Sequence, residues 1–264
     1  MLRSLKDLEG YAVSATDGDI GKVANFLLDD ERWAIRYLVV KAGGFFNDCH
    51  VLITPISFRQ IDWAPRRFHL ALTREKIKHS PSVDTDKPVS RQHESALFGY
   101  YGYPYYWGNP GLWGANGSPG LLAAERLYEV PPDPPTQSGD IHLRSAREIR
   151  GYHIRATDAS AGQIEDFIID DDTWEVRYLV VDTASWWKGK KVLIAPRWTR
   201  SISWAEGIVL LDLSQETIRK SPEWNPSAPI NREYEARLYD YYGHPVYWNE
   251  NEQPPKLAPP KDKS

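Results

Sequence analysis

Hydrophobic positions along the chain occur in short runs, separated by glycine, aspartate and proline. In one of these runs Ile35, Tyr37 and Val39 fall on one face of an extended segment, and the residues between them fall on the other. Such runs recur every ~8–14 residues, which favours an antiparallel β-barrel or sandwich over alternating strands and helices. Because both faces of the Ile35 segment are largely apolar, we expect it in the middle of the fold.

The pattern is present twice. Residues 3–107 and 144–248 align without a gap at a constant offset of 141 residues, and about 40% of the aligned positions are identical. The strands predicted for the first copy are Tyr11–Ser14, Lys22–Leu28, Ile35–Lys41, Cys49–Thr54, Phe58–Trp63 and Phe68–Leu72. Their equivalents are Tyr152–Arg155, Gln163–Ile169, Val176–Asp182, Lys191–Ala195, Thr199–Trp204 and Ile208–Leu213. We therefore predict an all-β-dominated fold with two small antiparallel barrels in tandem.

Each predicted barrel is followed by a short helix and then by an arm. The short helices, Thr73–His79 and Ser214–Lys220, open on a residue that caps helices well and end before Ser-Pro. Each arm reads as a helix of two to three turns, stopped by Gly102 or Gly243, with an extended aromatic strip after it. Two interpretations stay open: the arm packs on a barrel as a lid, or it offers an aromatic surface to a partner peptide.

These elements predict six segments. They are barrel 1 (1–82), arm 1 (83–107), a Gly/Pro-rich linker (108–143), barrel 2 (144–223), arm 2 (224–248) and a disordered tail (249–264).

Composition narrows the class of protein. The formal net charge of −4 and the pI near 6.0 give no basic footprint for nucleic acid. Residues 1–10 carry charges and have neither the apolar run of a signal peptide nor the length of a membrane span. One cysteine, Cys49, excludes an internal disulfide. We expect a cytoplasmic protein of bacterial type.

Reactive groups differ between the two copies. None of the 7 histidines aligns with a histidine in the other copy, and no common catalytic or metal-binding motif is present. A catalytic site that works in both copies should have the same reactive residues in both. We therefore expect no catalytic residues, no metal centre, no cofactor and no enzymatic activity.

The copies do share acidic turns and a strand arginine. These are Asp29, Asp30 and Arg36 in the first copy and Asp170, Asp171 and Arg177 in the second. Clustered carboxylates can bind divalent cations, and an arginine in a pocket can bind an anion. Aspartate is also favoured in turns, and an arginine beside such a turn commonly forms an ion pair within the protein. We favour the turn and the ion pair, and keep a small-molecule or metal site as the alternative.

One loop is aromatic and basic in the second copy only. Trp186, Trp187, Lys188, Lys190 and Lys191 replace a Phe-Phe-Asn-Asp-Cys-His loop, and such a set fits contact with an anionic membrane surface or an acidic protein. Packing of the two tryptophans against the arm is the alternative. The full set of candidate partner-binding residues adds Tyr100, Tyr101, Trp107, Tyr241, Tyr242 and Trp248 from the arms.

Several shared motifs together resemble a known family. They are Gly-Tyr-x-Val/Ile-x-Ala-Thr-Asp (10–17 and 151–158), Gly-x-Val/Ile-x-x-Phe, Asp-Asp-x-x-Trp, Ile/Val-Arg-Tyr-Leu-Val-Val and Val-Leu-Ile-x-Pro. Joined, they look like the PRC-barrel, the domain shared by the reaction centre H subunit and ribosome-maturation factors. The resemblance covers about residues 3–80 and 144–221 and implies two strongly bent antiparallel barrels that act through protein contacts. The chain departs from the H subunit in showing no N-terminal membrane helix, and from the maturation factors in having barrels in both halves.

The leading hypothesis is a non-enzymatic tandem adaptor that binds protein partners. One location that fits this hypothesis is the cytoplasmic side of a membrane complex of the photosynthetic or electron-transport type. The partner and the oligomeric state stay open, homo-oligomers included.

Overall fold

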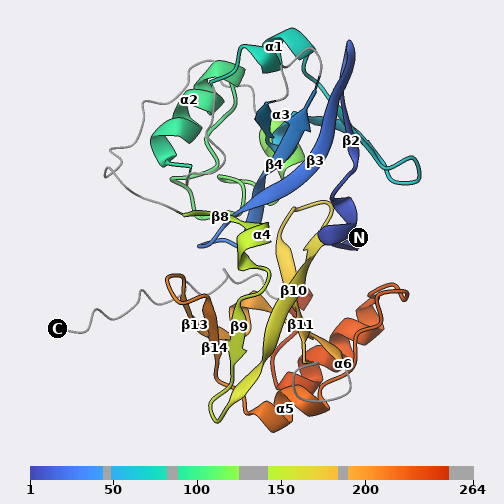
Figure 1. Ribbon diagram of the computed structural model, residues 1–264, viewed down its shortest axis with the longest axis vertical. Helices are drawn as coiled ribbons and strands as arrows, with labels where there is room; N and C mark the ends of the chain where they lie inside the picture. Colours follow the sequence, from blue (N-terminus) through green and yellow to red (C-terminus); the bar gives the residue numbers. More distant parts are fainter. Residues whose placement is uncertain (44–48, 82–88, 125–141, 184–189, 250–264) are drawn as a thin grey trace, which may run out of the picture. The chain divides into compact units, whose positions relative to one another are not determined.

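The computed structural model describes residues 1–43, 49–81, 89–124, 142–183 and 190–249 (Figure 1). These residues are mostly β, with two sheets of seven strands each and few helices. They divide into two compact units. The first-repeat unit holds residues 6–147 and 171–175, and the second-repeat unit holds residues 1–5, 148–170 and 176–264. The first-repeat unit therefore contains two short segments of the second repeat, 144–147 and 171–175, and the second-repeat unit contains the start of the first repeat.

The sheet of the first-repeat unit has the strand order β5-β4-β3-β2-β7-β6, with β8 paired to β3. Its strands are β2 (Ala12–Ala15), β3 (Gly18–Asp29), β4 (Ala34–Ala42), β5 (His50–Ile53), β6 (Phe58–Asp62), β7 (Arg67–Leu70) and β8 (Leu143–Ser145).

The sheet of the second-repeat unit has the equivalent order, β12-β11-β10-β9-β14-β13, with β1 paired to β10. Its strands are β1 (Leu2–Ser4), β9 (His153–Arg155), β10 (Ser160–Asp170), β11 (Val176–Asp182), β12 (Lys191–Ile194), β13 (Thr199–Ser203) and β14 (Ile208–Leu211).

Two features of these sheets differ from the predicted antiparallel barrels. One pair in each sheet is parallel, β2 with β7 and β9 with β14. The reason is topological. In the first-repeat sheet, β2 to β5 are four consecutive strands joined by three antiparallel pairings, and β7 of the hairpin that follows returns to the free edge of β2 in the same direction as β2. Closure into a barrel is not confirmed, because among the described residues the end strands β5 and β6, like β12 and β13, are not paired with each other.

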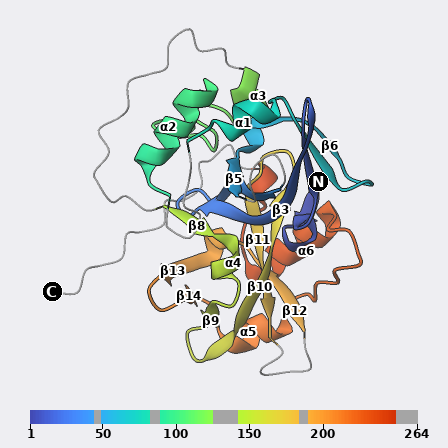
Figure 2. The ribbon, with the colours of Figure 1, turned by 45° about the horizontal axis from the view of Figure 1, so that its top comes forward.

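A three-residue strand at the start of each repeat pairs in the sheet that the other repeat mainly forms; we call these two strands, β1 and β8, the exchanged strands. β8 pairs with the C-terminal end of β3 in the register Leu27↔Ser145 and Asp29↔Leu143, and Figure 2 shows it beside β3. β1 pairs in the same way with β10, from Leu2↔Asp170 to Ser4↔Ile168. Since β2 covers only the N-terminal part of β3, the exchanged strand satisfies backbone groups that would otherwise form an open edge. Both strands have the sequence Leu-Arg-Ser, and a run of three residues is too short to show the alternation that marks a strand. The prediction of six strands per repeat therefore omitted them.

The core lies on both faces of the central strands, as predicted for the Ile35 segment. Ile35 and Tyr37 on one face and Leu38 and Val40 on the other are completely buried. In the second repeat Tyr178, Leu179 and Val180 are buried to the same extent.

The α-helices of the described residues are α1 (Arg74–Lys78), α2 (Arg91–Tyr101), α3 (Pro119–Ala124), α4 (Ala146–Ile149), α5 (Gln215–Lys220) and α6 (Arg232–Tyr242). Four of the described helices, α1, α2, α5 and α6, begin at the capping residues that the sequence predicts. Ser90 and Asn231 cap α2 and α6 with their side chains, and Gly102 and Gly243 end them in the left-handed conformation. The two arm helices are thereby confirmed. Among the described helices, all are too short or too polar to cross a bilayer.

The glycine where β3 meets β4 allows the two backbones to approach closely. A Cβ on Gly21 would lie 2.0 Å from the carbonyl oxygen of Lys41, and one on Gly162 would lie 2.2 Å from that of Asp182. We predict that Gly21→Val lowers the free energy of unfolding by about 2 kcal/mol or more, because backbone atoms have to move apart. Urea unfolding followed by tryptophan fluorescence measures this.

The matched control is Gly99→Ala in α2, where an added Cβ meets nothing within 4 Å. This change should leave stability equal or raise it by about 0.5–1 kcal/mol, since alanine favours helix. Equal destabilisation by the two substitutions would contradict the close approach at Gly21.

Candidate functional site

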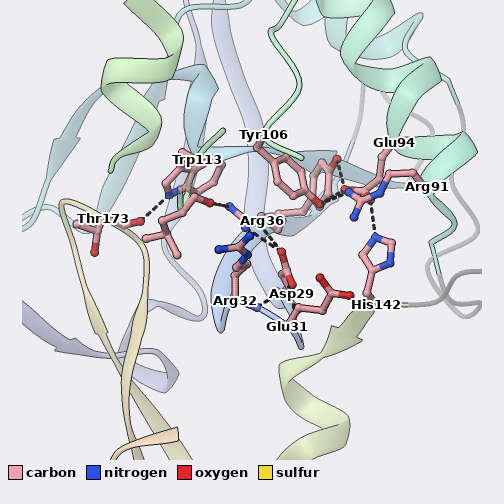
Figure 3. Close-up of polar contacts among 12 residues, drawn as sticks. Asp29, Glu31, Arg32, Arg36, Arg91, Glu94, Tyr106, Trp113, His142 and Thr173 are labelled. Atoms are coloured by element: carbon pink, nitrogen blue, oxygen red, sulfur yellow. Dashed lines mark hydrogen bonds and ion pairs between the residues drawn. The ribbon is translucent and has the colours of Figure 1, made fainter. Parts of the chain in front are cut away.

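Among the described residues of the first-repeat unit, an arginine, an aspartate and a glutamate lie buried. Arg36 on β4 is 1% exposed, Asp29 at the end of β3 is 3% exposed, and Glu94 on α2 is fully buried. Removing charges from water is costly unless each meets an opposite charge or hydrogen-bond donors. The contacts of these three groups therefore define the polar centre of the unit (Figure 3).

Asp29 holds Arg36 and the turn that separates their strands. Arg36 donates from Nε and Nη2 to Asp29 Oδ2, at 3.1 and 2.8 Å. Asp29 Oδ1 accepts the backbone N–H groups of Glu31 and Arg32, at 3.0 and 3.1 Å. Burial alone raises the pKa of the Asp29 carboxyl, but the charge and hydrogen bonds of Arg36 and the two backbone donors hold that pKa below its usual value. The predicted turn and internal ion pair are thus present at this position.

The guanidinium of Arg36 also contacts the chain that follows the first arm. Nη1 donates to the backbone oxygen of Leu112 at 2.7 Å. The guanidinium carbon lies 3.9 Å from the ring centre of Tyr106 and 4.6 Å from that of Trp113, both close enough for cation–π attraction. Trp113 in turn donates from Nε1 to the backbone oxygen of Thr173, at 2.7 Å (Figure 3).

Glu94 gathers donors from the sheet, the arm and the exchanged strand. Tyr37 on β4 donates to Oε1 at 3.0 Å, and the hydroxyl of Tyr106 donates to the same oxygen. Arg91 donates to Oε2 at 2.9 Å, and His142 Nε2, next to β8, lies 3.3 Å from it. Burial, and then the Glu94 charge, raise the pKa values of both tyrosines, which stay neutral donors.

The second-repeat unit repeats this arrangement around Glu235. Tyr178 and Tyr247 donate to Oε1 at 2.7 and 3.0 Å, and Arg232 donates to Oε2 at 3.0 Å. Arg177 lies 4.2 Å above the Tyr247 ring and 3.9 Å from the Asp170 carboxylate. In both units the buried glutamate therefore joins the arm to the central strand of its sheet.

The predicted acidic residues separate onto different partners. Asp29 faces Arg36, whereas Asp30 accepts from Arg144 Nε at 2.9 Å. Burial raises the pKa of Asp30 to about 6, although Arg144 opposes this shift. Asp170 belongs to the second-repeat unit, whereas Asp171 belongs to the first-repeat unit. Among the described residues, no group of three or more His, Cys, Asp and Glu side chains is placed to hold a metal ion.

The predicted partner-binding tyrosines fall into two classes. Tyr101 and Tyr242 are buried, and Tyr100 and Tyr241 are each 37% exposed. Even the exposed pair make internal bonds, from Tyr100 to the Lys76 carbonyl at 2.8 Å and from Tyr241 to the Thr217 carbonyl at 2.7 Å.

The predicted tryptophans of the arms differ from each other. Trp107 stacks on Tyr105 at 4.4 Å and is half-buried. Trp248 is 36% exposed.

The predicted basic loop of the second repeat is in part structural. Lys190 donates to the backbone oxygens of Arg219 and Ser221, and burial lowers its pKa. Lys191 pairs with Glu165 at 2.8 Å. Trp186, Trp187 and Lys188 lie outside the described residues, so their role stays a prediction.

Several members of the polar centre were missing from the predicted site. They are Tyr37, Arg91, Glu94, Tyr106 and His142 in the first-repeat unit, with Trp113 beside them. The first four have identical equivalents in the second repeat, and this identity was the available signal. His142 and Trp113 have no such counterpart, and only their three-dimensional positions reveal them.

Comparison with known proteins gives this architecture a family context. Residues 142–217 match the family model of the PRC-barrel domain. The PRC-barrel range starts just before β8 and continues into α5, so it includes the strand that pairs with β3 of the first-repeat unit. A relative from Deinococcus radiodurans, described only as an uncharacterized protein, is 32% identical over the aligned part, which covers 33% of this chain. The chain spans about a third (35%) of the length of that relative.

The buried glutamates should be needed for stability. We predict that Glu94→Ala lowers the free energy of unfolding by about 3–5 kcal/mol, because Arg91 and His142 lose the carboxylate they face in a buried site. Glu235→Ala, in the second arm, should act in the same direction. Urea unfolding measures both.

The control for this pair is Glu216→Ala, which removes an exposed glutamate that pairs with Arg219 and Lys220 on the surface of α5. Its effect should be far smaller, since solvent screens such pairs. Comparable losses for Glu94 and Glu216 would contradict a role that depends on burial.

His142 should make stability depend on pH. Burial is the largest influence on the pKa of His142 and lowers it. The hydrogen bond to Glu94, together with the charges of Glu94 and Asp29, outweighs burial and the nearby Arg91, so the pKa is raised above 6.5; Asp30 is a further charge near it. A raised pKa means that protonated His142 stabilises the folded state fully below pH 6.5, and that this contribution is lost as pH rises through the folded pKa. Urea midpoints of the wild type and of His142→Gln should therefore converge as pH rises.

Asp30 titrates in a lower range. Because its folded pKa is raised from 3.8 to about 6, charging it costs stability as pH rises through that interval. Measuring above pH 6.5 separates the two groups. A constant difference between wild type and His142→Gln across that range would contradict the assignment to His142.

Proposed function

We propose that this chain is a non-enzymatic module that binds protein partners through tandem PRC-barrel domains. The second domain is the one that matches the family model. The first repeat is proposed as a domain of the same kind, on the strength of its equivalent strand order, its equivalent helix caps and the same glutamate-centred cluster.

The observation that carries the proposal is the second arm. Arg232 has 59% of its side chain exposed and Trp248 is 36% exposed, with the guanidinium 4.5 Å above the indole ring. In the first arm Arg91 is only 12% exposed over the equivalent Trp107. Exposed tryptophan and arginine are enriched at protein interfaces, where an aromatic ring and a planar cation contribute most to binding.

The charged groups elsewhere support binding over chemistry. Asp29, Glu94 and Glu235 hold strands, turns and arms together in both repeats, and these contacts already engage their oxygens. We extend the proposal to a cytoplasmic, peripheral position at a membrane complex, which rests on the resemblance to the reaction centre H subunit.

The test is a cross-linked pull-down of the tagged full chain from its host, with soluble and membrane fractions resolved separately. Trp248→Ala should lose the partner that the wild type retains, because the exposed indole is removed from the interface. The matched control is Leu121→Ala, which removes an exposed apolar side chain, 58% exposed, from α3. It should keep the partner.

Two outcomes would count against the proposal. One is the same set of captured proteins for the wild type, Trp248→Ala and Leu121→Ala. The other is a clear rise in melting temperature with a divalent cation or phosphate, which would favour the ligand-binding alternative through Asp30 and the strand arginines.

A further inference from the structure

The first-repeat unit contains a bound peptide segment of its own. Residues Pro110–Gly114, here called the strap, follow the first arm and cross its polar centre. Arg32 donates to the Pro110 oxygen at 2.5 Å and Arg36 donates to the Leu112 oxygen at 2.7 Å. The Gly114 N–H donates to the Tyr106 oxygen at 2.8 Å. The strap is thus held through its backbone oxygens by two arginines.

The strap also carries an aromatic anchor. Trp113 is fully buried. Its ring lies 4.6 Å from the Arg36 guanidinium and 6.0 Å from the Tyr106 ring, in an edge-to-face arrangement (Figure 3). Arg36 therefore binds the strap in two ways: it donates a hydrogen bond to the backbone oxygen of Leu112, and it packs against the ring of the next residue, Trp113. Together these two contacts recognise a short peptide segment with one side chain.

The second-repeat unit has the same arrangement of arginines around a tyrosine, here called the platform (Arg177, Arg232 and Tyr247), and its arginines are more exposed. Arg177 lies 4.2 Å over the Tyr247 ring, and Arg232 lies 5.1 Å over the same ring. The Arg177 side chain is 12% exposed, against 1% for its equivalent Arg36. For Arg232 and its equivalent Arg91 the values are 59% and 12%.

The second repeat does not carry the strap sequence at the equivalent positions. The positions equivalent to Pro110–Gly114 are 251–255, with the sequence Asn-Glu-Gln-Pro-Pro. Pro254 therefore stands where the first repeat has Trp113, and the segment from 249 to the last residue contains no aromatic side chain. The positions equivalent to the strap therefore supply no aromatic anchor to the second-repeat unit.

The charged residues at the platform indicate which charge a bound peptide would carry. Arg197 replaces the first repeat's Ile56 and lies 5.7 Å from the Tyr247 ring, so three arginines surround one tyrosine. Salt bridges join Arg177 to Asp170 and Arg232 to Glu235, and the three guanidinium groups together give the platform a cationic character. Such a surface favours an acidic peptide and disfavours a basic one.

We propose that Arg177, Arg197, Arg232, Tyr247 and Trp248 form a binding site for an extended acidic segment of a partner protein that contains one aromatic residue. Arg177 takes a backbone or carboxylate oxygen of the segment, as Arg36 takes the Leu112 oxygen, and the aromatic ring packs against the arginines as Trp113 does. This inference rests on the proposed function and specifies the chemistry of the partner.

The test uses a fluorescein-labelled peptide, Asp-Pro-Gly-Leu-Trp-Gly-Glu, which is the strap sequence with an acidic residue at each end. Fluorescence polarisation with the full chain should give saturable binding. Arg232→Ala and Trp248→Ala should each weaken it at least tenfold. Arg200→Ala, an arginine 68% exposed on β13, should change it less than twofold. Melting temperatures of all variants identify any that fail to fold, and two variants of the proposed site guard against the loss of one.

The peptide itself supplies the second set of controls. Replacing its tryptophan by alanine, or its two acidic residues by lysine, should each weaken binding at least tenfold. Equal binding of these peptides, equal binding to the Arg232→Ala and Trp248→Ala chains, or no saturable binding by the wild type would overturn the proposal. A chain ending at Asn249 that binds the peptide at least tenfold more tightly would also overturn it, because the chain's own tail would then be the occupant.

The two proposals fail separately. If this peptide does not bind but Trp248→Ala still loses its partner in the pull-down, the adaptor function stands and the acidic-aromatic chemistry is wrong. If the pull-down shows no dependence on Trp248 while the peptide binds specifically, the site exists and the adaptor function is wrong.

Discussion

A carboxylate that is buried in a protein needs donors on every side, and Glu94 and Glu235 obtain them from separate parts of the chain. One tyrosine comes from the central strand, another from the extended strip of the arm, and an arginine comes from the helix that carries the glutamate itself. Helix, strip and sheet must therefore take their native positions together for the charge to be satisfied. The arm belongs to the folded unit because of this requirement, and aromatic packing alone would hold it less specifically.

The exchanged strands add a second constraint. Each repeat begins with Leu-Arg-Ser, yet that strand pairs in the sheet formed mainly by the other repeat. A repeat taken at its own sequence boundaries would therefore lack one strand, and β3 or β10 would be left with unpaired backbone groups at its C-terminal end. The duplication of the sequence and the composition of the folded units are thus not the same division of the chain.

The two repeats have diverged around a shared centre. Both keep the glutamate, the two tyrosines and the two arginines, but the first adds Trp113 and His142, whereas the second has Arg197 where the first has Ile56. Trp113 and its neighbours cover Arg36 almost completely, and Arg177 and Arg232 in the second repeat are more accessible. The same framework is therefore closed by its own chain in one unit and offers a cationic aromatic surface in the other, which is where the proposed partner site lies.

Much of this could be predicted from local pattern. Alternation located the strands of both repeats and the burial of both faces at Tyr37, and caps located the arm helices at Ser90 and Gly102, because these signals depend on neighbours along the chain. The duplication also marked Arg36 and Asp29 as an internal pair. Closed barrels and fully antiparallel sheets were expected; one parallel pair per sheet is present, and closure is not confirmed.

The contacts of Glu94 and the path of β8 could not be predicted in this way. Glu94 reads as a surface residue in the first turn of a helix, and it becomes the centre of the unit only when a strand 57 residues away and a histidine 48 residues away meet it. Three residues of β8 carry no periodicity, and their pairing is decided by the open edge of β3. Local sequence thus determined which segments are strands and helices; long-range pairing of backbone edges and buried charges decided which repeat completes which sheet and which charged groups are buried.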